Sequence, residues 1–241
     1  MTAANHAVLI KRAATASIFT AVTLLLAKVF AWSVSDSASV LSSLLDSLMD
    51  IAASLVNYFA VRYALMPADD DHPFGHTKAE GLAALVQSAF ILGSATFLLL
   101  HVLDRLVRPR ELVALEESIA VMIFSVFATM ALVAYQRWVY RQTQSLAIKA
   151  DSAHYYGDIL TSAAVVVALL AAQWDIYWLD PVVALGIAAV LLYSVYGIVT
   201  DALEVLMDKA MPEEDEEELK GIISSCAGVR GFHDLKTRQA G

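Results

Sequence analysis

Hydrophobic and polar residues divide the chain into long apolar stretches separated by short polar segments. The six apolar stretches cover residues 13–35, 38–62, 81–103, 117–139, 145–173 and 177–200. A helix needs about 20 apolar residues to cross about 30 Å of hydrocarbon, because each residue adds about 1.5 Å of rise. The pattern therefore predicts an all-α membrane protein with six transmembrane helices.

The apolar pattern ends near Met207, and the segment that follows is polar. Residues 208–212 interrupt the sixth helix, and residues 213–226 have the spacing of a soluble amphipathic helix. The apolar positions of that helix, three or four residues apart, are Leu219, Ile222, Ile223 and Cys226. Residues 232–238 are expected to begin a strand.

These patterns predict two domains. Residues 1–207 are expected to form the six-helix transmembrane domain, and residues 208–241 the beginning of a cytoplasmic α+β domain. One helix and one strand cannot bury a hydrophobic core alone. We therefore expect this second domain to be incomplete in the chain.

The first apolar stretch has a second interpretation, because Lys11 and Arg12 precede it as basic residues precede the core of a signal peptide. Apolar residues resume after Lys28, however, and no small-x-small cleavage motif follows at the usual distance. A retained transmembrane helix fits the sequence better.

Composition excludes several classes of protein. Of the 241 residues, 59% are hydrophobic and 17% are charged, and the mean hydropathy is +0.62. A soluble domain could not bury that much apolar surface, and disordered or collagen-like chains are far more polar. The single cysteine, Cys226, cannot form an intrachain disulfide. The net charge of −9 gives no basic surface for nucleic acid.

Basic residues in the short loops predict the orientation, since cytoplasmic loops are enriched in lysine and arginine. The loops on the side of the N-terminus contain Lys11, Arg12, Arg62, Lys78, Arg137, Arg141 and Lys149. Those on the other side contain Arg105, Arg108 and Arg110. We expect both the N- and the C-terminus in the cytoplasm.

Two pairs of polar residues interrupt the apolar helices. Asp46 and Asp50 lie four residues apart in the second stretch, and His154 and Asp158 repeat that spacing in the fifth. A spacing of four places both side chains of a pair on one helix face. On insertion scales, an aspartate near the bilayer centre costs about 2.5–3.5 kcal/mol, so such residues need a partner. Structural polar contacts or solvated helix ends are the alternative interpretation.

The two pairs lie at similar depths in antiparallel helices, so they predict a shared metal site of three carboxylates and one imidazole. Zn²⁺ accepts four such ligands in tetrahedral geometry, and Cd²⁺, Fe²⁺, Mn²⁺ and Co²⁺ also suit a site that contains an imidazole. Three carboxylates exceed the charge of one divalent ion, so the empty site should bind protons. Metal binding would then displace protons, which is the basis for exchange of metal against H⁺.

Other charged residues are weaker candidates. The loop at 67–77 contains Asp69, His72 and His76, which form either a second metal site or a solvated acidic turn. His233 is a candidate ligand in the cytoplasmic part. Lys78 and Asp208 are opposite charges near the inner membrane face and form a candidate ion pair.

Three segments carry a resemblance to the cation diffusion facilitators, in particular to the bacterial zinc and ferrous-iron efflux type. They are SLLDSLMDIAASLVNYFAVRYALMPADDDHPFGHTKAEGLAAL (43–85), YQRWVYRQTQSLAIKADSAHYYGDIL (135–160), and the tail with LMDKAMPEEDEEE (206–218) and GVRGFHDLKTRQAG (228–241). The resemblance covers the whole chain.

The resemblance implies a six-helix homodimer in the bacterial inner membrane that expels divalent metal in exchange for protons. It implies that Asp46, Asp50, His154 and Asp158 form the transport site. Further metal sites at Asp69, His72 and His76 in the loop and at His233 in a metallochaperone-like domain are implied as well. It also implies that Lys78 and Asp208 form a charge pair near the dimer interface.

The expected function is therefore a proton-coupled antiporter that exports Zn²⁺ by alternating access. Zn²⁺ is expected as the transported substrate and as a structural or regulatory ligand. Asp46, where many zinc-selective relatives have histidine, implies that Cd²⁺ is accepted too, and Fe²⁺ is a further candidate. Two other classes of protein are alternatives, namely a metal sensor or uncoupled channel and an intramembrane metallohydrolase. The hydrolase would need an HExxH-type motif, which the sequence lacks.

Overall fold

A computed structural model describes residues 3–35, 38–107, 116–172, 174 and 178–238. Arg108 and Arg110, counted above among the basic residues of the outer loops, lie outside the described residues. The helices are α1 (Ala3–Ser35), α2 (Ala38–Ala64), α3 (Ala79–Val107), α4 (Glu116–Thr143), α5 (Leu146–Ala172), α6 (Leu179–Leu206) and α7 (Glu213–Ser225).

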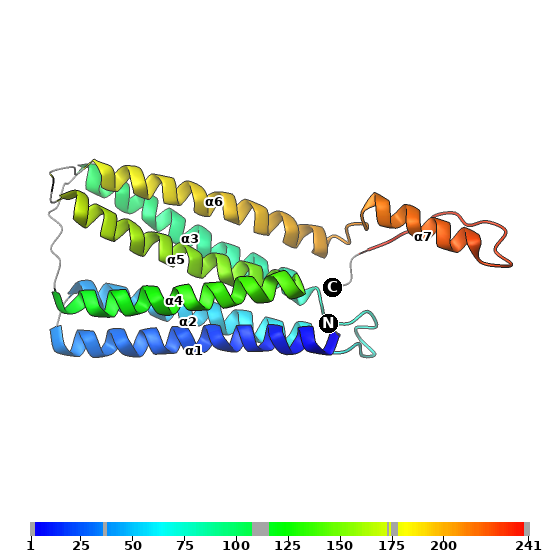
Figure 1. Cartoon of the computed structure of the whole chain (residues 1–241), viewed down its shortest axis with the longest axis horizontal. Coiled ribbons are helices and arrows are strands. Elements are labelled where there is room, and N and C mark those ends of the chain that lie inside the picture. The colour runs from blue at the N-terminus through cyan, green and yellow to red at the C-terminus, as the bar shows by residue number, and fades with distance from the viewer. Residues whose placement is uncertain (1–2, 36–37, 108–115, 173, 175–177, 239–241) are drawn as a thin grey trace.

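The first six helices lie side by side as a long bundle, and α7 extends beyond the end of α6 (Figure 1). Each of the six apolar stretches of the sequence has become one helix of this bundle. Three of the helices contain segments long and apolar enough to cross a membrane, namely Ala4–Ser33, Ala79–Leu100 and Leu179–Leu206. Six membrane crossings remain a prediction.

The bundle has two groups of helices, with α5 packed between them. In one group, α3 and α6 pack on α5 through small and aliphatic side chains. In the other, α1 packs on α2 and α4, and their buried cluster also includes Ala83 of α3 and Ala147 and Ile148 of α5. Small residues let helix backbones approach closely in membranes. At Gly157, an added Cβ would lie 2.9 Å from Cδ2 of Leu191 in α6.

The outside of the bundle is apolar while part of its inside is polar. Phe19, Phe97 and Tyr193 are each at least 70% exposed. Asn57 and Gln87, by contrast, are completely buried. Large exposed apolar surfaces are typical of contact with lipid. The chain is therefore a mostly helical membrane protein.

The helix predicted at 213–226 is confirmed as α7, whose acidic first turn favours the positive end of the helix dipole. The strand predicted at 232–238 is wrong, because no residue described by the structure belongs to a strand. A strand must form backbone hydrogen bonds with a neighbouring strand, and none of these joins residues 232–238 to another described segment. Cys226, directly after α7, is exposed. A cytoplasmic α+β domain thus remains a prediction.

Candidate metal centre

Two facing helices bring three potential metal ligands together inside the bundle. Ligand atoms of Asp50 in α2 and of His154 and Asp158 in α5 all lie within 4.8 Å of one another. Asp50 Oδ1 is 3.3 Å from His154 Nε2. The i, i+4 spacing in α5 places His154 and Asp158 on the same side, facing α2. Helix geometry and the antiparallel course of α2 and α5 (Figure 1) therefore assemble the cluster.

The His154 imidazole is a suitable ligand because its Nε2 atom is unsatisfied. The side chain is only 5% exposed, and Nε2 has no hydrogen-bond partner in the described part of the chain. Buried polar atoms are normally hydrogen-bonded or bound to an ion. Flanked by carboxylate oxygens, this nitrogen is suited to bind a divalent cation.

Asp46, the fourth expected ligand, is placed differently. It precedes Asp50 by one turn of α2, but its side chain is exposed and it is not among the three clustered residues. Lys28 of α1 donates a hydrogen bond of 2.6 Å to Ser47 and acts electrostatically on Asp46. No role was expected for Lys28 from the sequence, yet this residue places a positive charge beside the carboxylates.

A second cluster forms in the loop between α2 and α3. Ligand atoms of Asp69, His72 and His76 lie within 4.8 Å of one another. Asp69 Oδ1 is 3.1 Å from His72 Nδ1, and Asp69 Oδ2 is 3.4 Å from His76 Nε2. Gly75, at a φ of 81°, allows the tight turn that folds the two histidines together. The loop thus has the geometry of a shallow metal site.

The pKa of Asp69 is lowered. The main cause is the backbone N–H of His72, which donates a hydrogen bond of 2.6 Å to Asp69 Oδ1. The His72 side chain adds to this effect. The carboxylate is therefore held in its charged form, which is the form that binds metal.

Lys78 and Asp208 form an ion pair at the end of the bundle where the loop cluster lies. Lys78 Nζ lies 2.9 Å from Asp208 Oδ2 and also donates to the carbonyl oxygen of Leu206, at 3.2 Å. The hydrogen bond from Lys78 is the main reason why the pKa of Asp208 is lowered. Arg238 lies 3.7 Å from Asp208 and 3.8 Å above the ring of Phe74. The pair joins the residue before α3 to the chain after α6.

His233 lies close to one other potential metal ligand, the carboxylate of Asp234. Its Nδ1 atom is 3.0 Å from Asp234 Oδ2, and the imidazole is 92% exposed. No group of three potential ligands forms around it among the described residues.

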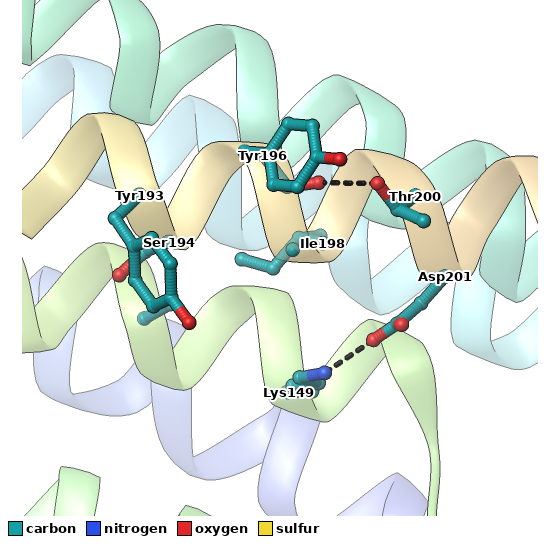
Figure 2. Close-up of a pocket in the computed structure, with 9 residues that line it drawn as sticks. Lys149, Tyr193, Ser194, Tyr196, Ile198, Thr200 and Asp201 are labelled. Carbon is teal, nitrogen blue, oxygen red and sulfur yellow. Dashed lines mark hydrogen bonds and ion pairs between the residues drawn. The ribbon is translucent and has the colours of Figure 1, made fainter.

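Two further charged residues of α5, Lys149 and Asp151, were not expected in any site. Lys149 of α5 pairs with Asp201 of α6 beside a groove of about 420 Å³, and Figure 2 shows their side chains pointing toward each other. Asp151, one turn before His154, is completely buried. Their position near the inner ends of apolar helices was the signal available in the sequence.

Comparison with known proteins shows a family over most of the chain. Residues 14–207 match the model of the cation efflux transmembrane domain, and residues 211–241 match that of the cation efflux protein cytoplasmic domain. The cation-efflux pump FieF of Klebsiella pneumoniae (strain 342) is 47% identical over 97% of this chain and 78% of its own length. FieF of Yersinia enterocolitica is 46% identical over 98% of this chain and 79% of its own length.

These matches identify a transporter and not an enzyme. A family model that covers most of the chain, together with relatives of this similarity, leaves no ambiguity about descent. The chain belongs to the cation efflux family, the cation diffusion facilitators.

Proposed function

We propose that this transporter exports divalent metal from the cytoplasm in exchange for protons, with Zn²⁺ as its main substrate. The observation that carries the proposal is the cluster of the buried His154 with the partly buried Asp50 and Asp158, whose ligand atoms lie within 4.8 Å of one another. The printed names of the relatives, which are cation-efflux pumps, support efflux as the direction of transport.

The chemistry of the ligands favours Zn²⁺. Two carboxylates and one imidazole supply three ligands of a tetrahedral site, and Asp46 or a water molecule would supply the fourth. No thiol is present near the cluster, since Cys226 follows α7, so a thiolate site for Cu(I) is excluded there. Cd²⁺ and Fe²⁺ are proposed as further substrates, because carboxylate and imidazole ligands accept both.

Proton exchange follows from the charges of the cluster. Carboxylates packed within a few ångströms of one another repel, so without metal they should take up protons. A metal ion must displace these protons when it binds, and protons arriving from the opposite side would release the metal. Alternating access of the cluster to the two sides would make this exchange a transport cycle.

We further propose a homodimer in the bacterial inner membrane, with the transmembrane domain at residues 1–207 and the cytoplasmic domain beginning at 208–241. The match of residues 211–241 to the family's cytoplasmic domain supports the second part. The loop cluster of Asp69, His72 and His76 would bind additional Zn²⁺, and His233 would contribute to a cytoplasmic site. In this arrangement Lys78 and Asp208 lie near the dimer interface.

Proteoliposomes that report internal pH and Zn²⁺ together test the proposal. Imposing a Zn²⁺ gradient on vesicles should drive Zn²⁺ across the membrane and protons in the opposite direction. Zn²⁺ flux without proton counterflow would indicate a channel, and the absence of Zn²⁺ flux would indicate a sensor. The Asp50→Ala variant should lose flux, and Asp71→Ala, in the loop outside both clusters, should retain it.

A further inference from the structure

A completely buried carboxylate lies directly beneath the candidate transport site. Asp151 precedes His154 by three residues in α5, so both lie on the same helix face. Its Oδ2 atom accepts hydrogen bonds from Ser17 Oγ of α1 and, at 2.6 Å, from Gln136 Nε2 of α4. Its Oδ1 atom accepts one of 3.2 Å from Gln87 Nε2 of α3. Asp151 therefore ties α5 to three other helices.

These contacts do not make Asp151 a metal ligand. Each partner that the structure gives its oxygens is an N–H or O–H donor, and donors of this kind stabilise an anion. A cation would need oxygen or nitrogen lone pairs directed toward it. The carboxylate is therefore part of the scaffold that holds the helices.

The same network reaches α2 just beyond Asp50. Gln87 Nε2 also donates to the carbonyl oxygen of Ala53, at 3.1 Å, and so bridges α2 and Asp151. In the next position, Ser54 Oγ and Tyr155 Oη are hydrogen-bonded at 2.7 Å. The two helices that contribute the metal ligands are thus joined one turn away from the metal cluster.

Such a bridge matters because α2 and α5 pack mainly against other helices. α2 packs mostly on α1 and α3, whereas α5 packs mostly on α3, α4 and α6. Sliding one helix past the other by a single residue would move its ligands by about 1.5 Å. Metal–ligand distances tolerate deviations of only about 0.2 Å. Something must therefore fix the register between the two helices.

We propose that Asp151 and Gln87 are positioning residues that hold α2 and α5 in the register at which Asp50, His154 and Asp158 converge on the metal. The inference rests on the proposed function of that cluster. Residues outside the ligand shell that orient ligands typically change metal affinity about 10- to 100-fold when replaced.

Cd²⁺ titration of the purified full chain tests the proposal, in a background with Asp69→Ala and His72→Ala that removes the loop cluster. Asp151→Ala should weaken Cd²⁺ binding by about 10- to 100-fold. Asp151→Asn should stay close to the unchanged protein, because its Oδ1 still accepts from Gln87. Its Nδ2 can donate to Gln136 Oε1, which has no partner among the described residues. Retained Cd²⁺ binding in Asp151→Asn would show that the hydrogen bonds of this side chain, and not its charge, hold the ligands in place.

Gln87→Met is the second variant, since it keeps the length of the side chain and the Asp151 charge but removes the bridge to Ala53. It decides the question if Asp151→Ala does not fold. Asp201→Asn is the matched control, because it removes an ion pair of α5 that lies outside the network. Gln87→Met should weaken Cd²⁺ binding by at least about tenfold, and Asp201→Asn should not change it.

Three outcomes would overturn the inference: unchanged Cd²⁺ affinity in Gln87→Met, unchanged affinity in Asp151→Ala, or an Asp151→Asn variant as weak as Asp151→Ala. Asp50→Ala in the same background distinguishes this failure from failure of the proposed function. If Asp50→Ala abolishes binding while Gln87→Met leaves it intact, only the positioning role is lost. If Asp50→Ala also binds normally, the transport site itself is wrong.

Discussion

The Nε2 atom of His154 lies 3.3 Å from Oδ1 of Asp50. The two residues come from helices far apart in the sequence, yet their side chains meet within the bundle. Both side chains are ionisable, and such groups are stable inside an apolar bundle only when they share a proton or a cation. The contact between His154 and Asp50 therefore marks the point at which a cation is expected to bind.

The two aspartates of α2 should contribute unequally. Asp50→Ala removes a member of the cluster and should abolish Zn²⁺ transport. Asp46→Ala should reduce transport less, because the Asp46 side chain is exposed and lies outside the cluster. Zn²⁺ flux into proteoliposomes measures both. Equal loss in the two variants would mean that Asp46 is a full ligand in the transporting state.

The loop cluster depends on the backbone at Gly75, whose φ of 81° is strained for residues with a Cβ. Gly75→Ala should weaken Zn²⁺ binding at Asp69, His72 and His76, since the left-handed conformation costs such a residue about 1–2 kcal/mol. Gly75→Asn is the matched control, because asparagine visits this conformation more readily. Calorimetry in an Asp50→Ala background, which leaves the loop as the main site, would show the difference. Equal affinities for the two variants would argue against a role for the turn.

The ion pair of Lys78 and Asp208 should withstand mild acid. The hydrogen bond from Lys78 lowers the pKa of Asp208 below the usual value of about 3.9. Because the pKa of this carboxyl is lowered in the folded protein, the ion pair stabilises the fold at pH values above the usual pKa. This stabilisation is lost as the pH falls through the lowered pKa. Carboxyl NMR of labelled protein should therefore show Asp208 ionised at pH 4.5. Lys78→Gln should move its titration upward, and an unchanged titration would contradict the pairing.

The close approach of α5 and α6 at Gly157 should not tolerate a larger residue. In Gly157→Ala, the new Cβ would lie 2.9 Å from Leu191 Cδ2, so the helices or the leucine must shift. Overpacking of this kind typically costs about 1–3 kcal/mol. Gly197→Ala in α6, where no heavy atom lies within 4 Å of the added Cβ, should be neutral or stabilising. Thermal unfolding in detergent compares the two, and equal midpoints would refute the argument.

Much of the site could be predicted from spacing alone. Acidic residues and a histidine four apart in apolar helices are costly unless they share a partner, and this argument selected Asp46, Asp50, His154 and Asp158. The structure brings the last three together, and their role as a transport site stays a prediction. The loop residues were also identified, because a short turn containing glycine and proline can gather its own side chains.

What the sequence did not predict depends on contacts between distant helices. The partners of Asp151 lie on α1, α3 and α4, and no periodicity within α5 shows which of their side chains will face it. The exposure of Asp46 likewise depends on how α2 is rotated against its neighbours. The strand expected at 232–238 is absent because a strand is defined by hydrogen bonds to a partner, and the residues of one segment do not show that partner.

The exposed Cys226 has a practical consequence, because it is the single thiol of the chain. A membrane-impermeant maleimide added to intact cells should leave it unmodified if the C-terminal segment faces the cytoplasm, and should label it once the membrane is opened. Labelling of Cys226 therefore reports on which side of the membrane the C-terminal segment lies, without any substitution.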